Sequence, residues 1–415
     1  MRQRKKKPIV ELVATGNEII EGRVVDTNAV FASRKLINAG FEIAWRSLVG
    51  DEKRRFLNVL NTAFKRADII IISGGLGPTE DDLTRAACAA VLNTKLVYNK
   101  TAEKHISGIL ARYGRIPDKT ELRQAYFPKH NTKIVPNKNG TACGFICEKN
   151  GKILSALSGV PSEYEQMLTQ TVLPFLKKKY KTTNLPNKIF NTIGKSESEI
   201  QKIVYPIISN YKLSWGITAR QMVISVSISA GSDKKSQFKS ACKELRKSLA
   251  EISFSEDSIM LEESVLQLLK EHHYTLAVAE SCTGGLILDK LTDIPGASDV
   301  LVEGVVSYSN DSKVRRLGVH RADISKFGAV SEEVARQMAS GVRRNSSADI
   351  GIATTGIAGP GGAAATKPVG LVYIAFAAKK SVHVKKFTFT GNRRDIKERA
   401  ANAALSMIHT FCNKG

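Results

Sequence analysis

Apolar runs that alternate with amphipathic segments constrain the fold of this chain more than any other feature. Apolar runs at 9–14, 41–50 and 67–75 alternate with two segments of helical period, 28–39 and 53–66. Strands that alternate with helices form βαβ units. A strand that is apolar on both faces is typical of a parallel sheet covered by helices on both sides. The first part of the chain is therefore expected to have an α/β fold.

This alternation is interrupted once and then begins again. A polar stretch at 178–187 ends the first pattern, and a smaller pattern of mixed helices and strands follows it. A second α/β pattern starts near residue 257 and finishes with an amphipathic helix over 393–412. A chain of this length is expected to hold two or three domains. We predict an α/β domain over 1–180, a small α+β domain over 181–256 and a second α/β domain over 257–415.

Composition narrows the classes of function. The formal net charge is +23, which favours phosphorylated ligands and raises the question of nucleic acid. The lysines are spread along the chain with few aromatic residues among them, so a base-stacking surface is not favoured. Six scattered cysteines predict neither disulfides nor a zinc site and indicate a cytoplasmic protein. No apolar run approaches the ~20 residues of a membrane-spanning helix, so no membrane partner is expected.

The segment SGGLGPTEDDLTR (73–85) carries the strongest signal of the first half. Glycines can bring the backbone close to a ligand, and this segment follows a buried strand, where open α/β sheets bind ligands. We expect Thr79 to open a helix, with Asp82 at capping-box spacing and free N–H groups that suit a phosphate. Carboxylates here could hold a divalent cation, although acidic residues in a first turn also simply stabilise a helix dipole. The candidate phosphate ligands are Gly74, Gly75, Gly77 and Thr79, with Asp81 and Asp82 as candidate metal ligands.

A second candidate site follows the apolar run at 276–280. Ser281 stands at the end of this predicted strand, ahead of Thr283, Gly284, Gly285 and a helix. A hydroxyl on such a turn can be exposed beside backbone N–H groups that stabilise an oxyanion. A base is needed, and no Ser-His-Asp set is evident.

A lysine of lowered pKa can serve as that base. The next strand ends at Tyr308, and Lys313 follows at the start of a helix that we expect Asn310 to cap. A Ser/Tyr/Lys group is therefore available on two strand ends, although strand-end tyrosines and helix lysines are also common surface residues. Cys282 is the rival nucleophile, provided that its pKa is lowered.

A third glycine loop, TTGIAGPGGAAATKPVG (354–370), follows another buried strand. Its backbone N–H groups could cradle a phosphate. With AESCTGG, YSN-x2-K, GAVSEEVA and TGNRRDI, this loop closely resembles the C-terminal domain of the CinA (competence/damage-inducible protein A) family, which is also found alone as a nicotinamide mononucleotide amidohydrolase.

The resemblance implies particular roles in that reaction. Ser281 would be the nucleophile, Lys313 the base and Tyr308 a proton relay, and no cofactor would be needed. Backbone N–H groups near Thr283–Gly285 would stabilise the oxyanion. The residues expected to hold the nucleotide include Asn310, Thr355, Gly356, Ala358, Gly359 and Arg393.

The first half resembles the N-terminal domain of the same family through SGGLGPTEDDLT, GNE-x3-G-x3-DTN, NGTACGF and SGVPSEYEQML. That domain is similar in fold to molybdopterin-binding MoaB and MogA proteins. The resemblance implies hydrolysis of ADP-ribose to AMP and ribose 5-phosphate with a divalent metal ion of the Co, Mg or Mn type, held by Asp81, Asp82 and Glu18. Asn17 stands where the family often has aspartate. The resemblance also implies a KH-like middle domain and a homodimer.

Two other classes of function compete with a bifunctional nucleotide hydrolase. The net charge and the family's name suggest an accessory protein of DNA uptake or recombination, for which steeply salt-dependent DNA binding is expected. The N-terminal resemblance suggests a molybdopterin-binding protein, for which a co-purifying pterin is expected.

Overall fold

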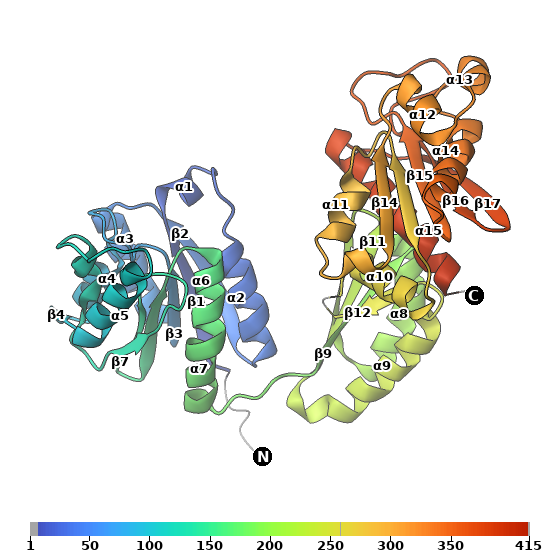
Figure 1. Ribbon diagram of the computed structural model, residues 1–415. Coiled ribbons are helices and arrows are strands. Elements are labelled where there is room, and N and C mark those ends of the chain that lie inside the picture. Colours follow the sequence, from blue (N-terminus) through green and yellow to red (C-terminus); the bar gives the residue numbers. More distant parts are fainter. Residues whose placement is uncertain (1–6, 258, 414–415) are drawn as a thin grey trace. The chain divides into compact units, whose positions relative to one another are not determined.

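The computed structural model describes residues 7–257 and 259–413 (Figure 1). The chain divides into two compact units, Met1–Leu185 and Pro186–Gly415, so the predicted break at 178–187 contains the boundary. No helix among the described residues is long and apolar enough to cross a membrane.

The first unit is built on a six-stranded mixed sheet with the strand order β2-β1-β3-β8-β7-β6. β2, β1, β3 and β8 are parallel, whereas β7 and β6 run antiparallel to their neighbours. A two-stranded ribbon, β4 and β5, lies outside this sheet. The strands are β1 (Ile9–Thr15), β2 (Glu42–Val49), β3 (Ile69–Ser73), β4 (Leu96–Tyr98), β5 (Tyr126–Pro128), β6 (Lys133–Val135), β7 (Gly144–Lys149) and β8 (Lys152–Leu157).

Helices cover both faces of this sheet, as the apolar runs predict. Ile69 and Ile71 of β3 point into one hydrophobic core, and Ile70 and Ile72 point into the other. The first core is closed by α2 (Thr27–Asn38), α6 (Pro161–Met167) and α7 (Leu173–Tyr180), and the second by α3 (Lys53–Arg66), α4 (Thr84–Val91) and α5 (Lys100–Ala111). A short helix, α1 (Asn17–Ile20), follows β1.

Two local features of the first unit follow from backbone chemistry. The hairpin between β7 and β8 turns on Asn150 and Gly151, both at positive φ, as expected for an Asn-Gly turn. The pattern of residues 162–180 predicts a helix interrupted at Pro174, and the structure has instead α6, a π-helical turn at Leu168–Val172 and α7. Pro174 lies in the first turn of α7, where its missing N–H costs little.

The second unit begins with a four-stranded antiparallel sheet in the order β10-β11-β9-β12. The two helices α8 and α9 pack on it around a core of its own, formed by Val204, Val226 and Leu245 among others. The elements are β9 (Asn187–Ile193), α8 (Glu197–Tyr211), β10 (Ser214–Arg220), β11 (Val223–Ser229), α9 (Lys235–Leu249) and β12 (Ser253–Glu256). This is the α+β pattern expected for the middle of the chain.

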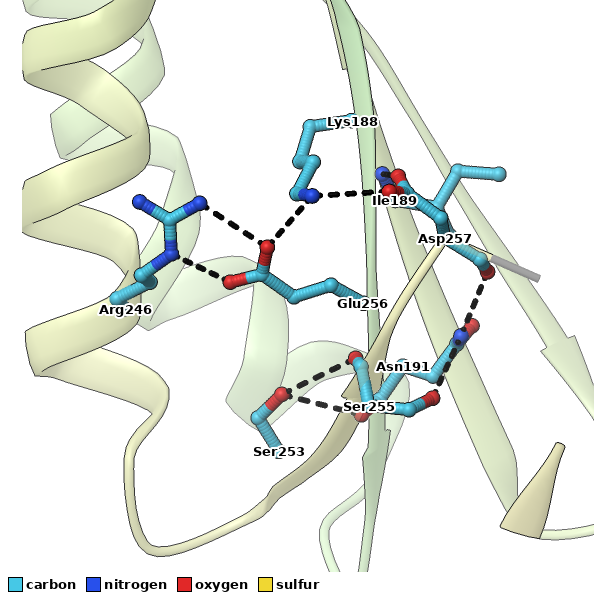
Figure 2. Close-up of polar contacts among 8 residues, drawn as sticks. All are labelled: Lys188, Ile189, Asn191, Arg246, Ser253, Ser255, Glu256 and Asp257. Atoms are coloured by element: carbon cyan, nitrogen blue, oxygen red, sulfur yellow. Dashed lines mark hydrogen bonds and ion pairs between the residues drawn. The ribbon is translucent and has the colours of Figure 1, made fainter. Parts of the chain in front are cut away.

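An ion-pair network holds the end of β12 against β9 and α9 (Figure 2). Glu256 accepts hydrogen bonds from Arg246 at 2.5 and 3.0 Å, and Lys188 lies 2.7 Å from it. Lys188 also pairs with Asp257 at 2.8 Å. The amide of Asn191 donates to Ser255 Oγ and to the Asp257 carbonyl, each at 3.0 Å. These contacts fix the chain where it leaves the small sheet.

The rest of the second unit is built on a five-stranded sheet in the order β14-β13-β15-β16-β17. β14, β13 and β15 are parallel, and β16 and β17 are antiparallel. The elements are α10 (Leu261–Glu271), β13 (Leu276–Glu280), α11 (Leu286–Thr292), β14 (Leu301–Val306), α12 (Asn310–Leu317), α13 (Arg321–Phe327), α14 (Glu332–Asn345), β15 (Ile350–Gly356), β16 (Leu371–Ala378), β17 (Ser381–Thr388) and α15 (Arg393–Cys412).

This sheet is also covered on both faces. Large side chains such as Val278, Ile352 and Ile374 face α10, α11 and α15. Alanines such as Ala279 and Ala353 face α12, α13 and α14. The parallel strands therefore have their carboxyl ends at one edge of the sheet, which is where ligands bind in this class of fold.

The packing predicts unequal effects of two neighbouring residues in α2. Leu36 is fully buried, whereas Ile37 is 49% exposed. Leu36→Ala should lower the free energy of unfolding of the first unit by about 2–5 kcal/mol because it leaves a cavity. Ile37→Ala should change it by about 0.5 kcal/mol or less. Urea unfolding followed by Trp45 fluorescence, in a Trp215→Phe background, measures both, and equal effects would contradict this packing.

Candidate active site

Ser281 follows β13 at the carboxyl edge of the second sheet. Its backbone N–H donates to the Thr354 carbonyl of the neighbouring β15 at 3.0 Å, which holds the residue against the sheet. The chain then turns sharply through Gly284 and Gly285, which have φ values of 61° and 93°. Glycine adopts this left-handed conformation without steric cost. The turn places Ser281 at the strand end, as the sequence predicts, but the residue is buried, with 8% of its surface exposed, so the exposed hydroxyl that such a turn permits is not found.

Lys313 reaches Ser281 from the first turn of α12. Its Nζ lies 2.9 Å from Ser281 Oγ, and it also donates to the carbonyls of Ser307 at 2.9 Å and Tyr308 at 3.3 Å. Lys313 is only 1% exposed, and no carboxylate pairs with it within the described ranges. The pair proposed from the sequence is thus brought into direct contact.

Burial has opposite consequences for the two candidate reactive groups. It lowers the pKa of Lys313 below its ordinary value, because an ammonium group loses hydration that no counter-charge replaces. Burial raises the pKa of the Cys282 thiol to about 12. A neutral Lys313 can accept a proton from Ser281, whereas Cys282 stays protonated. The environment therefore favours Ser281 over Cys282 as the nucleophile.

The backbone donors of the turn are partly occupied. Gly285 N–H donates to Glu280 Oε2 at 2.9 Å, and Gly284 N–H donates to the Ser281 carbonyl at 3.2 Å. The amides of Cys282 and Thr283 donate to no other residue in the part of the chain that the structure describes. Of the oxyanion donors predicted at 283–285, Thr283 N–H is the one left free, and the preceding Cys282 N–H is a second candidate. The Thr283 side chain is buried and bonds to Thr354 Oγ1 at 2.7 Å.

Glu280 is a site residue that our sequence reasoning missed. Its side chain is fully buried, and its two oxygens accept from Gly285 N–H and from Leu288 N–H at 3.0 Å. The carboxylate thereby fixes the turn to the first N–H groups of α11. A glutamate in an otherwise apolar strand, directly before Ser281, was the available signal.

Tyr308, Arg393 and Gly359 come together beside this turn. Arg393 donates to the Gly359 carbonyl at 2.6 Å and to the Tyr308 hydroxyl at 3.0 Å. The Tyr308 side chain is 62% exposed, and its contact with Lys313 is through the backbone carbonyl. The hydroxyl expected to relay a proton is thus bonded to Arg393, and its role as a relay stays a prediction.

The predicted capping role of Asn310 is wrong. Ser309 is the N-cap of α12, and its hydroxyl accepts from Ser312 N–H at 3.1 Å. Asn310 is the first residue of the helix. Because both residues are common at helix starts, the sequence alone did not distinguish them.

The glycine loop after β15 is held at both ends. Thr355 donates to the Ala329 carbonyl at 2.8 Å, and Lys367 donates to the Phe327 and Val330 carbonyls at 2.5 and 2.7 Å. Gly356 ends β15, and Ala358 is buried in the core below the loop. The loop is therefore anchored next to Arg393 rather than free.

Lys397 is a second residue that our sequence reasoning did not single out. Its Nζ would lie 3.5 Å from a Cβ at Gly284, so the amine stands over the turn that follows Ser281. Lys397 is one helical turn beyond Arg393 on α15, and this i, i+4 spacing places both cations on the same face.

The candidate site of the first unit surrounds the glycines after β3. Gly74 and Gly75 have φ values of 102° and 64°, and a Cβ at Gly74 would lie 2.6 Å from the Thr15 carbonyl. Only glycine allows so close an approach between these two strand ends. Arg85, which is buried and has a pKa lowered to about 10 by burial, donates to the carbonyls of Leu76 and Gly77 at 2.6 Å.

The prediction that Thr79 opens a helix is wrong. Asp82 accepts from Gly77 N–H at 2.7 Å, from Thr79 N–H at 2.9 Å and from the Thr79 hydroxyl at 2.5 Å. These bonds close a loop, and α4 begins only at Thr84. The side chain of Asp82 competes with helical hydrogen bonding, as short polar side chains do.

Three carboxylates were expected to hold a metal ion. Asp82 is committed to the loop, Asp81 is exposed and Glu18 lies against Gly16. Across residues 7–257 and 259–413, no three histidine, cysteine, aspartate or glutamate side chains are grouped so that they could hold a metal ion. Glu18, Asp81 and Asp82 therefore do not form a ready-made metal centre.

The fold and the two sites define a chain of two α/β-containing units, each with glycine turns at the carboxyl edge of its sheet, and one with a buried Ser–Lys pair. Residues 258–412 match the CinA C-terminal domain, and residues 11–178 match the "Probable molybdopterin binding domain". The chain belongs to the CinA family.

Relatives of full length support this assignment. A competence-damage inducible protein of Caldanaerobacter subterraneus subsp. tengcongensis is 39% identical over 404 residues, covering 97% of this chain and 98% of the relative. One from Clostridium kluyveri is 41% identical over 404 residues, covering 96% and 98%.

Solved structures match one part of the chain at a time. The competence/damage inducible protein CihA of Agrobacterium tumefaciens is 41% identical, covers 35% of this chain and 90% of its own, and has a TM-score of 0.35. The molybdopterin biosynthesis enzyme MoaB of Thermus thermophilus is 22% identical, covers 41% and 92%, and has a TM-score of 0.29.

The lowered pKa of Lys313 predicts a pH-dependent contribution to stability. Between its lowered pKa in the folded protein and its ordinary pKa of about 10.4, Lys313 binds more protons in the unfolded state than in the folded state. Its contribution therefore makes the stability of the wild type rise with pH over this range. Lys313→Met removes this cost. The variant should be more stable than the wild type at pH 7, and the difference should shrink as the pH approaches 10.

Urea unfolding at pH 7–10, followed by Trp215 fluorescence in a Trp45→Phe background, measures this difference. Lys326→Met, which removes an exposed lysine of α13, is the matched control and should follow the wild type. Parallel curves for the wild type and Lys313→Met would show that Lys313 is not held in a dehydrated site.

Proposed function

We propose that the C-terminal part of the second unit hydrolyses the carboxamide of nicotinamide mononucleotide to give nicotinate mononucleotide and ammonia. The observation that carries this proposal is the 2.9 Å contact between Ser281 Oγ and the buried Nζ of Lys313. A hydroxyl beside an uncharged amine can attack an amide carbon. The family resemblance supplies the substrate.

The residues present allow a balanced reaction. Neutral Lys313 takes the Ser281 proton as Oγ bonds to the carboxamide carbon, and the amides of Cys282 and Thr283 stabilise the oxyanion. Lys313 then gives this proton to the leaving nitrogen, the carbon–nitrogen bond breaks and ammonia departs. Water attacks the resulting ester as Lys313 accepts its proton. The ester bond breaks, Ser281 regains a proton and the nicotinate carboxylate is released.

The surrounding cations suit the nucleotide phosphate. Arg393 and Lys397 stand on the same face of α15, and Arg393 is already positioned by the carbonyl of Gly359. Arginine binds phosphate through two parallel hydrogen bonds. We assign the phosphate to these cations and to the loop over 357–370, with the carboxamide directed toward Ser281.

Substituting the two candidate nucleophiles tests the proposal. Ser281→Ala should lower kcat for ammonia release from nicotinamide mononucleotide by about 10³-fold or more, because the acyl-enzyme can no longer form. Cys282→Ala is the matched control and should retain activity within about tenfold, because its thiol stays protonated.

Ammonia release is measured with the purified full-length protein, and melting curves check that each variant folds. The reverse pattern would make Cys282 the nucleophile. If the folded wild-type protein releases no ammonia from nicotinamide mononucleotide, the deamidase function itself is refuted.

For the first unit we propose hydrolysis of the pyrophosphate bond of ADP-ribose, the substrate that the family resemblance implies. The specific observation is Asn28, which is 6% exposed. Its amide nitrogen donates to Ser73 Oγ at 2.9 Å and to the Gly159 carbonyl at 2.8 Å, whereas its Oδ1 is buried without a hydrogen-bond partner. An unpaired buried acceptor beside the Gly74 turn supports a ligand that donates a hydrogen bond there, such as a ribose hydroxyl.

Removing this acceptor should weaken ADP-ribose hydrolysis. Asn28→Ala should raise KM for ADP-ribose by about tenfold, since losing one partner of a buried hydrogen bond costs about 1–3 kcal/mol. Asn58→Ala, on the exposed face of α3, is the control. The measurement is AMP and ribose 5-phosphate formation with and without divalent metal. An unchanged KM in folded Asn28→Ala would exclude the Asn28 contact, and no hydrolysis by the wild type would refute the activity.

A further inference from the structure

A basic hollow on the second unit is lined by residues from the C-terminal half of α14 and from the turn that joins β16 to β17. Figure 1 shows where these elements lie. The volume of the hollow is about 620 Å³. The helix contributes side chains at the i, i+4, i+7 and i+8 positions from Arg336, and the hairpin contributes its tip. The charged and hydroxyl residues of the lining are Arg336, Arg343, Arg344, Lys379, Lys380, Ser340, Ser347 and Ser381.

The positive charge of this hollow is only partly neutralised. Arg336 pairs with Glu332 at 2.8 Å, and Arg343 interacts with Asp349, whose carboxylate already accepts two hydrogen bonds from Thr275. Neither acidic residue lines the hollow. Arg344, Lys379 and Lys380 take part in no ion pair within the described ranges. Such clustered cations attract a multiply charged anion.

We propose that this hollow binds a small compound that carries several phosphate groups. One arginine side chain can bind two oxygens of a phosphate group at once. The three serine hydroxyls of the lining can donate hydrogen bonds to the remaining oxygens. A hollow of this size is typical of small-molecule sites. No aromatic side chain lines it, so the base stacking that single-stranded nucleic acid uses is missing.

The hollow lies at the opposite end of the sheet from Ser281. It is lined by Ala348, before β15, and by Ala377, which pairs with Gly351 at the start of that strand. Ser281 is bonded to Thr354, toward the other end of β15. Gly351 and Thr354 are three residues apart on β15, which is about 10 Å along a strand. A ligand in the hollow therefore leaves Ser281 open, and this binding is independent of the proposed deamidase function.

Calorimetric titration of the full-length protein with inorganic tripolyphosphate tests the proposal. The double variant Arg344→Gln/Lys380→Gln should raise the Kd by at least tenfold. The matched control Lys385→Gln/Lys386→Gln removes the same charge from exposed positions of β17 that do not line the hollow, and it should stay within twofold of the wild type. Ser281→Ala should bind as the wild type does. Melting curves verify that every variant folds.

Three results would overturn the proposal. The first is wild-type protein that does not bind tripolyphosphate at physiological salt. The second is an equal loss of affinity in both double variants, which would reveal diffuse attraction by surface charge. The third is tighter binding of a single-stranded oligonucleotide than of tripolyphosphate, lost in the same Arg344→Gln/Lys380→Gln variant, which would assign the hollow to nucleic acid.

Discussion

The contact between Lys313 and Ser281 depends on the five-stranded sheet of the second unit, because the two residues follow different strands of it. A lysine side chain ordinarily keeps its charged end in water, but Lys313 is only 1% exposed. Here three short contacts, to one hydroxyl and two backbone carbonyls, hold the amine at the sheet edge. Burying this group costs stability, and the same burial makes it a base. The burial of Lys313 thus lowers the stability of the fold and at the same time makes the amine able to accept a proton.

The surrounding structure holds this arrangement by backbone geometry. β13, β14 and β15 are parallel, so the segments that carry Ser281, Lys313 and the loop after Gly356 all leave the sheet at one edge. Glu280 ties the turn after Ser281 to α11. The first unit also has glycine turns beside a strand end. There, however, the side chains of Asp82 and Arg85 form hydrogen bonds within the loop itself. The second unit therefore presents a formed Ser281–Lys313 pair, whereas the described residues of the first unit present no group of side chains that could hold a metal ion.

Patterns that depend on local sequence were predicted well. The helices over 53–66 and 393–412 have the bounds expected from their periodicity, and the Asn150-Gly151 turn forms its hairpin. Errors arose where two local solutions compete. Asp82 folds back onto Thr79 instead of following it into a helix, and Ser309 caps α12 in place of Asn310. Strands β9, β10 and β12 were not distinguished, since their half-exposed residues lack a continuous apolar signal.

Which residues could perform chemistry was determined by the sequence itself, because a hydroxyl after an apolar strand, glycines that permit a sharp turn and a lysine at a helix start are all local features. Only the tertiary structure decided which of them meet. It brought Lys313 to Ser281 across 32 positions, directed the Tyr308 hydroxyl to Arg393 and kept Glu18 from joining Asp81 and Asp82 in one cluster. The reason is physical: distances between side chains from different strands, and the loss of water around them, exist only once the sheet has assembled.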